Sequence, residues 1–298
     1  MGKIGSTPGS FDLGAIEEPD LPFTKQEYLS RIRKVCLFMQ QEGIDLLWIT
    51  TPDAICWLHG FLASWYKGNS PMRYPQCYGT AIHAATGRFI FFETPTEMPV
   101  VANTSISEDN RWLPDREAQP NIRFIMGQLR REGWLKGVVG MEFWSYVPNR
   151  VISTMFENAF VSEGCKTIDA SELVRKARRV KSFQEISYTE KAMEICDIGH
   201  QVIVNELREG ITELELYGNV MAKMIAAGGY CPALIPVFNA AKVVDGKVQS
   251  TGHSMASHKP IKKGTVLWAD LFGVFHRYHV NALRGYYLGD DAPQVIVD

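Results

Sequence analysis

Strand-like and helix-like segments alternate through the first 170 residues, and this alternation restricts the fold of the chain more than any other feature. Short apolar runs at 44–49 and 138–142 have the length of buried strands, and segments with a helical period separate them. Thr24 and Glu27 form a T-x-x-E pattern that predicts the start of the first helix. Such alternation predicts a three-layer α/β domain. The polar segment 103–119 has no period and is predicted to be a surface loop.

The second half of the chain has a different order of elements. Ser182 and Glu185 repeat the capping pattern and predict a long helix, on whose apolar stripe His200 is expected to be a core histidine with a local partner. A further helix is predicted from about Thr212 to Ala227. Strand-like segments then follow at 234–238, 265–270, 276–280 and 286–288. Helices followed by strands predict an α+β domain.

These patterns divide the chain into four segments. We expect a lead-in at 1–20, a first domain at 21–170, a charged linker at 171–182 and a second domain at 183–298. A length of 298 residues suits two domains.

Charge and cysteine usage exclude several classes of partner and location. The formal net charge is −2 and no long basic block occurs, so neither nucleic acid nor a membrane surface is an expected partner. No apolar run reaches the roughly 18 residues that span a bilayer. The six cysteines lack paired spacing, which predicts reduced thiols, and the N-terminus has no apolar signal core. We therefore expect a cytoplasmic protein.

Two residues of the second domain are candidates for chemistry. His253 follows a glycine in a polar loop, where an imidazole suits general acid–base work. Asp270 ends the apolar run that begins at Thr265, and a strand can deliver a carboxylate into a cleft in this way, although a turn residue at a strand end is the alternative. Asn281 stands eleven residues after Asp270, and its neutral amide is a poorer metal ligand than aspartate.

A histidine-rich cluster follows Asp270. His276 and His279 are three residues apart, so on one strand they would face opposite sides and could not bind one metal without a bend. One inward histidine and one solvated histidine are expected. Arg277 and Arg284 are the cations of this region.

Three segments, in this order, resemble the creatinase/aminopeptidase P superfamily. Residues 21–61 read LPFTKQEYLSRIRKVCLFMQQEGIDLLWITTPDAICWLHGF and are similar to the N-terminal domain of the family. Residues 174–199 read VRKARRVKSFQEISYTEKAMEICDIG and are similar to its interdomain joint. Residues 259–289 read KPIKKGTVLWADLFGVFHRYHVNALRGYYLG and are similar to a strand pair of its catalytic domain.

The resemblance implies a fold. We expect a creatinase-like α/β N-terminal domain followed by an α+β catalytic domain with the pita-bread fold. In the family this catalytic domain runs more than a hundred residues beyond the position of Gly289, so the resemblance implies a truncated chain. An open sheet edge would then be a hazard for association.

The resemblance also implies two kinds of site. In the metallopeptidase branch the position of Asp270 is a metal-bridging aspartate, and a second aspartate stands where this chain has Asn281. The creatinase branch works without metal and uses a histidine that matches His253 as its acid–base residue. The ectoine hydrolase branch resembles this chain in the run Arg277, Tyr278 and His279, and in an acidic residue at Asp270.

We therefore expect a hydrolase that cleaves a C–N bond of a small creatine- or ectoine-like compound without a cofactor. His253 would be the general acid–base residue, and Asp270 would orient the substrate or activate water. The expected substrate-binding residues are Arg73, Arg277, His279 and Arg284. Arg73 resembles a residue that reaches the partner's site in creatinase-type dimers, so a homodimer is expected.

Three alternatives stay open. The first is an Xaa-Pro aminopeptidase or dipeptidase with one or two divalent metal ions, in which Asp270 would be a ligand. The second is a lyase of the same fold that acts on a small sulfonium zwitterion. The third is a non-catalytic binding module.

Overall fold

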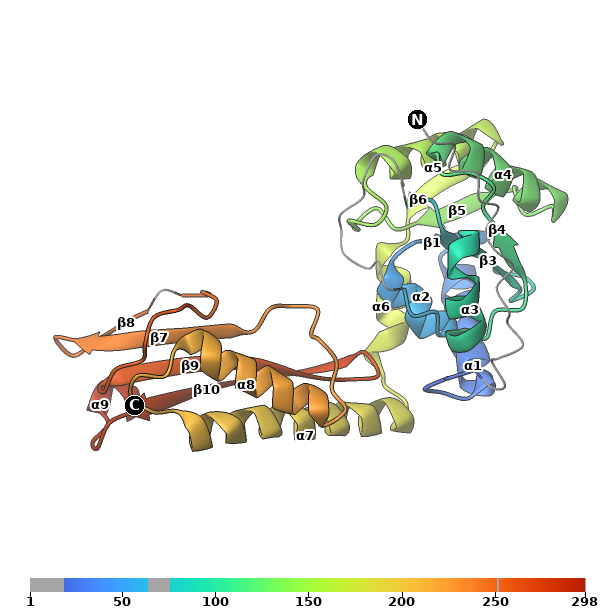
Figure 1. Cartoon of the computed structure of the whole chain (residues 1–298). Coiled ribbons are helices and arrows are strands. Elements are labelled where there is room, and N and C mark those ends of the chain that lie inside the picture. Colours follow the sequence, from blue (N-terminus) through green and yellow to red (C-terminus); the bar gives the residue numbers. More distant parts are fainter. Residues whose placement is uncertain (1–18, 64–75, 251, 298) are drawn as a thin grey trace, which may run out of the picture. The chain divides into compact units, whose positions relative to one another are not determined.

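The computed structural model describes residues 19–63, 76–250 and 252–297 (Figure 1). Contacts divide the chain into two compact units, Met1–Val180 and Lys181–Asp298. No helix among the described residues has the length and apolar character required to cross a membrane.

The first unit is built on a mixed six-stranded sheet with the order β4-β3-β2-β1-β5-β6. β1 pairs in parallel with β5 and antiparallel with β2, and β5 pairs in parallel with β6. The strands are β1 (Leu46–Ile49), β2 (Gly79–His83), β3 (Phe89–Glu93), β4 (Asn110–Trp112), β5 (Val138–Met141) and β6 (Lys166–Asp169).

Helices cover both faces of this sheet (Figure 1). α4 and α5 lie on one face, and α1, α2 and α6 lie on the other. The helices of the unit are α1 (Lys25–Gln41), α2 (Pro52–His59), α3 (Met98–Thr104), α4 (Ala118–Arg131), α5 (Arg150–Ser162) and α6 (Ser171–Arg179), with a short 3₁₀ turn, η2 (Pro95–Glu97). The three-layer α/β prediction is confirmed.

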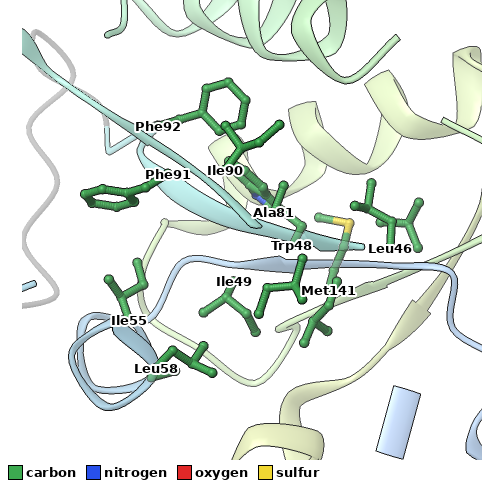
Figure 2. Packing of buried hydrophobic residues seen from close by; sticks show 14 of the residues in the cluster. Leu46, Trp48, Ile49, Ile55, Leu58, Ala81, Ile90, Phe91, Phe92 and Met141 are labelled. Atoms are coloured by element: carbon green, nitrogen blue, oxygen red, sulfur yellow. The ribbon is translucent and has the colours of Figure 1, made fainter. Parts of the chain in front are cut away.

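Alternation along the strands explains why both faces are apolar. Trp48 of β1 packs against Phe156 of α5 with ring centroids 4.9 Å apart. The next residue, Ile49, points to the other face, towards Ile55 and Leu58 of α2 (Figure 2). Continuous apolar strands of this kind are typical of a sheet that is covered on both sides.

Two segments of the first unit differ from the sequence prediction. The predicted loop 103–119 contains β4, which pairs in parallel with β3 and is too short to show a period. The segment 171–182, predicted as a linker, contains α6, whose Leu173, Val174 and Ala177 are buried in the core of the first unit. Five charged residues within α6 conceal this apolar stripe in the sequence.

The second unit has an antiparallel four-stranded sheet with the order β10-β9-β7-β8. The elements are α7 (Phe183–Glu206), α8 (Glu213–Ala226), β7 (Val237–Val244), β8 (Lys247–Gln249), β9 (Thr265–Phe275), β10 (Tyr278–Leu288) and α9 (Gln294–Val297). α7 and α8 lie along one face of the sheet (Figure 1). This is the predicted α+β arrangement. The two segments predicted at 276–280 and 286–288 are one continuous strand, β10.

The face of β9 that α7 and α8 cover carries Leu267, Ala269 and Leu271, which are buried with Ile195 and Ile203 of α7. Because successive side chains of a strand point to opposite faces, the intervening residues of β9 lie on the other face. Asp270 is one of them, and the site is built around it.

Candidate functional site

Asp270 and Asn281 lie on neighbouring strands and contact each other. In the register of β9 and β10, Asp270 is opposite Leu283 and Asn281 is opposite Phe272, so all four share one face. Asn281 Nδ2 donates a hydrogen bond to Asp270 Oδ1. A carboxylate only accepts hydrogen bonds, so the NH₂ side of the amide must face Asp270.

Apolar side chains lie next to this pair on the same face of β9 and β10. The indole of Trp268 lies beside Gly285 of β10, where a Cβ would come within 3.1 Å of the ring. Leu283, directly across from Asp270, is 57% exposed. The site therefore combines one carboxylate and one amide with apolar surface, which suits a compact ligand with both polar and apolar parts.

His253 lies on an exposed loop that continues from β8 along β7. Asn239 Nδ2 donates to the carbonyl of Gly252 at 2.6 Å, and the N–H of Phe238 donates to the carbonyl of Ser254 at 3.3 Å. Phe238 is opposite Ala269 in β9. His253 is thus held next to β7, about two strand spacings or ~10 Å from the strand of Asp270.

The predicted substrate-binding residues do not all lie on this face. His279 is opposite Val274 and shares the face of Asp270, two residues along β10 from Asn281. Arg284 lies on the helix-covered face, where its guanidinium pairs with Asp197 Oδ1 of α7 at 3.2 Å.

The other two predicted binding residues are placed differently. Arg277 is in the turn between β9 and β10, with its guanidinium 5.9 Å from the ring centroid of Tyr230. Arg73 lies outside the described residues.

His200 is the core histidine that the sequence predicts, and its partners are on β10. Its Nε2–H donates to the carbonyl of Ala282 at 3.0 Å, and its Nδ1 accepts from the hydroxyl of Tyr286 at 2.7 Å. Burial is the main cause that lowers the pKa of His200, and burial raises the pKa of Tyr286 to about 12. The neutral imidazole therefore links α7 to β10 through two hydrogen bonds, one of them to Ala282, the residue that follows Asn281.

The residues around Asp270 do not fit a dinuclear metal centre. Such a centre needs bridging carboxylates, and the second position here presents the N–H of an amide to Asp270. In 19–63, 76–250 and 252–297 there is no group of three or more His, Cys, Asp or Glu side chains arranged to hold a metal ion.

Comparison with known families agrees with this architecture. The model of the creatinase/prolidase N-terminal domain matches residues 31–180, and the model of metallopeptidase family M24 matches residues 187–297. The chain belongs to the creatinase/aminopeptidase P superfamily, a superfamily of hydrolases. Solved structures of relatives confirm the expected pita-bread fold class.

Two curated relatives represent different chemistry. The ectoine hydrolase of Halomonas elongata is 28% identical over 287 residues, which cover 90% of this chain and 67% of the relative. The Xaa-Pro dipeptidase of Pyrococcus furiosus is 24% identical over 263 residues, which cover 87% of this chain and 65% of the relative. The chain spans about two thirds of the length of these relatives.

Solved structures of the superfamily share the fold. The Xaa-Pro dipeptidase from Bacillus anthracis superposes with a TM-score of 0.71 at 17% identity, covering 90% of this chain and 67% of that one. The prolidase from Pyrococcus furiosus gives a TM-score of 0.66 at 18% identity, covering 86% and 70%. At these identities the structural similarity shows the fold alone. The chemistry has to be inferred from the residues of the site.

Proposed function

We propose that this protein is a hydrolase that cleaves a C–N bond of a small creatine- or ectoine-like compound without a metal ion. The observation that carries the proposal is the hydrogen bond from Asn281 to Asp270. It gives the carboxylate a neutral partner at the place where a bridging metal centre needs a second negative charge. The similarity to an ectoine hydrolase over 90% of the chain supports the same substrate class.

In this proposal His253 and Asp270 divide the work. Asp270 accepts a hydrogen bond from the substrate or from the attacking water, and Asn281 holds its carboxylate in one orientation. Water adds to the carbon of the C–N bond while His253 takes the proton that this water loses. His253 then gives that proton to the departing nitrogen as the C–N bond breaks. A histidine suits both halves of this transfer because its ordinary pKa lies near neutrality.

Substrate binding would use the residues nearest this face. Arg277 would bind a substrate carboxylate, and His279 would lie at the hairpin end of the site. Arg284 is paired with Asp197 on the other face, so it would need to leave that pair to contact a substrate. Arg73 of a second subunit would complete the site in a homodimer.

A second candidate is an Xaa-Pro dipeptidase that uses divalent metal. The match to metallopeptidase family M24 and the similarity to the Xaa-Pro dipeptidase of Pyrococcus furiosus favour it. Asp270 would be one ligand, and the remaining ligands would come from outside the described residues.

Turnover in the presence and absence of a chelator separates these candidates. The purified protein is offered creatine, ectoine and an Xaa-Pro dipeptide, and bound metal is measured by elemental analysis. Chelator-insensitive hydrolysis of the small compound would support the proposal, and dipeptide cleavage that the chelator abolishes would contradict it. Absence of turnover with all three would leave the lyase or the binding module.

The role of His253 is tested with a matched pair of substitutions. His253→Ala should lower kcat at least about a hundredfold, the usual contribution of a general acid–base group. His258→Ala, at another exposed histidine of the same loop region, should leave kcat unchanged. Equal activity of the two variants would remove His253 from the mechanism.

A further inference from the structure

The turns of the two hairpins in the second unit have similar, positive φ values but different residues. Asp245 and Gly246 join β7 to β8 with φ values of 50° and 67°. His276 and Arg277 join β9 to β10 with φ values of 45° and 70°. Two-residue hairpins with positive φ at both positions favour Asp-Gly, because a Cβ is unfavourable in the left-handed region. His276 and Arg277 therefore hold a strained turn, and such strain concentrates at functional positions.

The strained turn presents a carbonyl to His279. His279 Nδ1 donates to the carbonyl of Arg277 at 2.8 Å, and His279 Nε2 accepts from the N–H of Ala233 at 3.1 Å. A carbonyl only accepts and a backbone N–H only donates, so the ring must be the neutral tautomer with its proton on Nδ1. The left-handed conformation of Arg277 thus sets the direction in which His279 Nε2 points.

Ala233 belongs to the loop that joins α8 to β7, residues 227–236, which we name the α8–β7 loop. Near the start of this loop the N–H of Tyr230 donates to the carbonyl of Val274 in β9 at 3.1 Å. The loop ends before Val237, which is directly opposite Asp270. The α8–β7 loop therefore runs beside the half of β9 that carries Asp270. β9 lies between β7 and β10, and the side chain of His279 extends from β10 to the loop.

The α8–β7 loop brings apolar side chains to this end of the site. Leu234 and Ile235 are 65% and 64% exposed, and they stand three and two residues before Val237. Pro232 and Pro236 restrict the backbone on both sides of these residues. The N–H of Ala233 lies between the prolines, and its bond to His279 fixes the middle of the loop.

We propose that His279 is a positioning residue, which holds the α8–β7 loop as an apolar wall beside Asp270. The wall contacts the apolar part of a compact substrate through Leu234 and Ile235, while Asp270 and Asn281 contact its polar part. This inference rests on the proposed function for the identity of the substrate. The anchoring of the α8–β7 loop by His279 does not depend on that function. His279 itself does not transfer a proton, because both of its ring nitrogens are engaged.

Hydrogen–deuterium exchange of the α8–β7 loop is the first test, because it reports the anchor whether or not a substrate turns over. His279→Leu removes the acceptor and should raise the exchange rate of the Ala233 amide about fivefold or more, the effect of losing one hydrogen bond. His279→Gln can accept through Oε1 and should restore protection. The control His258→Leu should change nothing. Unchanged exchange in His279→Leu would overturn the proposal.

Kinetics with the hydrolysed compound is the second test. His279→Leu should raise KM about fivefold or more with kcat within about twofold, because a displaced wall weakens binding without touching the reacting atoms. His279→Gln should return KM to its original value. If kcat falls strongly while the hydrogen–deuterium exchange of the α8–β7 loop stays unchanged, His279 takes a direct part in the reaction. That result would overturn the positioning role. If the unsubstituted protein hydrolyses none of the compounds, the proposed function fails, while exchange still decides the anchor.

Discussion

Asn281 donates a hydrogen bond to the carboxylate of Asp270 across two neighbouring strands, on the face of the sheet opposite the one that α7 and α8 cover. Since β9 and β10 are joined by a two-residue turn, a separation of eleven residues brings these side chains to diagonal positions. The same spacing with two aspartates would set two negative charges side by side. The neutral amide removes that repulsion and orients Asp270.

Asn281→Asp should therefore create a site that needs a cation. Without divalent metal the variant should melt about 2 to 4 °C lower, the shift expected for the loss of about 1 kcal/mol in a chain of this size. Added Mn²⁺ should raise the melting temperature of the variant more than that of the unsubstituted protein. Asn281→Ala is the control, because it removes the amide without adding charge. Equal responses of all three proteins to Mn²⁺ would contradict this account.

His200 should stabilise the second unit through its two hydrogen bonds to β10. His200→Leu leaves the carbonyl of Ala282 and the hydroxyl of Tyr286 without this partner, which should cost about 1 to 3 kcal/mol in the free energy of unfolding. Tyr286→Phe removes one bond and should cost less. The double variant should fall short of the sum, since both changes break the same contact. If urea unfolding shows that the two losses of unfolding free energy simply add in the double variant, the hydrogen bond between His200 and Tyr286 contributes nothing to stability.

The same histidine gives the stability a pH dependence. Burial lowers the pKa of His200 in the folded chain, so the unfolded chain binds more protons below the ordinary histidine pKa. Stability should therefore be lost as the pH falls from about 6.5 through the lowered pKa. His200→Leu should flatten this part of the profile, measured by urea unfolding between pH 7 and pH 5. An identical slope in the variant would assign the pH dependence to other groups.

Some of these features could be predicted from the sequence and others could not. The cap at Ser182 and Glu185 is local, and both of its hydrogen bonds are present. The fold class followed from alternation and from the resemblance. The partner of His200, Tyr286, is 86 residues away, and only the pairing of α7 with β10 brings it close. Periodicity also could not reveal that Arg284 faces Asp197, because that depends on β10 being one unbroken strand.

Glu93 at the end of β3 should destabilise the first unit as the pH rises. Its side chain is buried, and burial raises its pKa to about 8. The folded chain therefore binds more protons than the unfolded chain between the ordinary carboxyl pKa, about 4.3, and pH 8. The resulting stability is fully present below that range and is lost as the pH rises through 8.

Glu93→Gln tests this, because glutamine keeps the shape of the protonated side chain. The variant should match the original protein near pH 4 and exceed it by a few kcal/mol near pH 8, as measured by urea unfolding. Glu117→Gln, at an exposed glutamate of the same unit, is the control and should leave the profile unchanged. A variant that is less stable than the original at pH 8 would indicate that ionised Glu93 is well solvated or paired.

Exchanging the residues of the two hairpin turns should change stability in opposite directions. Replacing His276 by Asp and Arg277 by Gly gives the β9–β10 turn the residues that suit its positive φ values, and should stabilise the second unit by about 1 kcal/mol or more. Gly246→Arg places a side chain at φ 67°, where no other atom lies within 4 Å, and should destabilise by a similar amount through strain alone. The stabilised variant keeps the carbonyl of residue 277, which accepts from His279. The hydrogen–deuterium exchange rate of the α8–β7 loop should therefore not rise in this variant. A stabilised turn with a freely exchanging loop would show that the side chains of His276 and Arg277, rather than the backbone of the turn, orient His279.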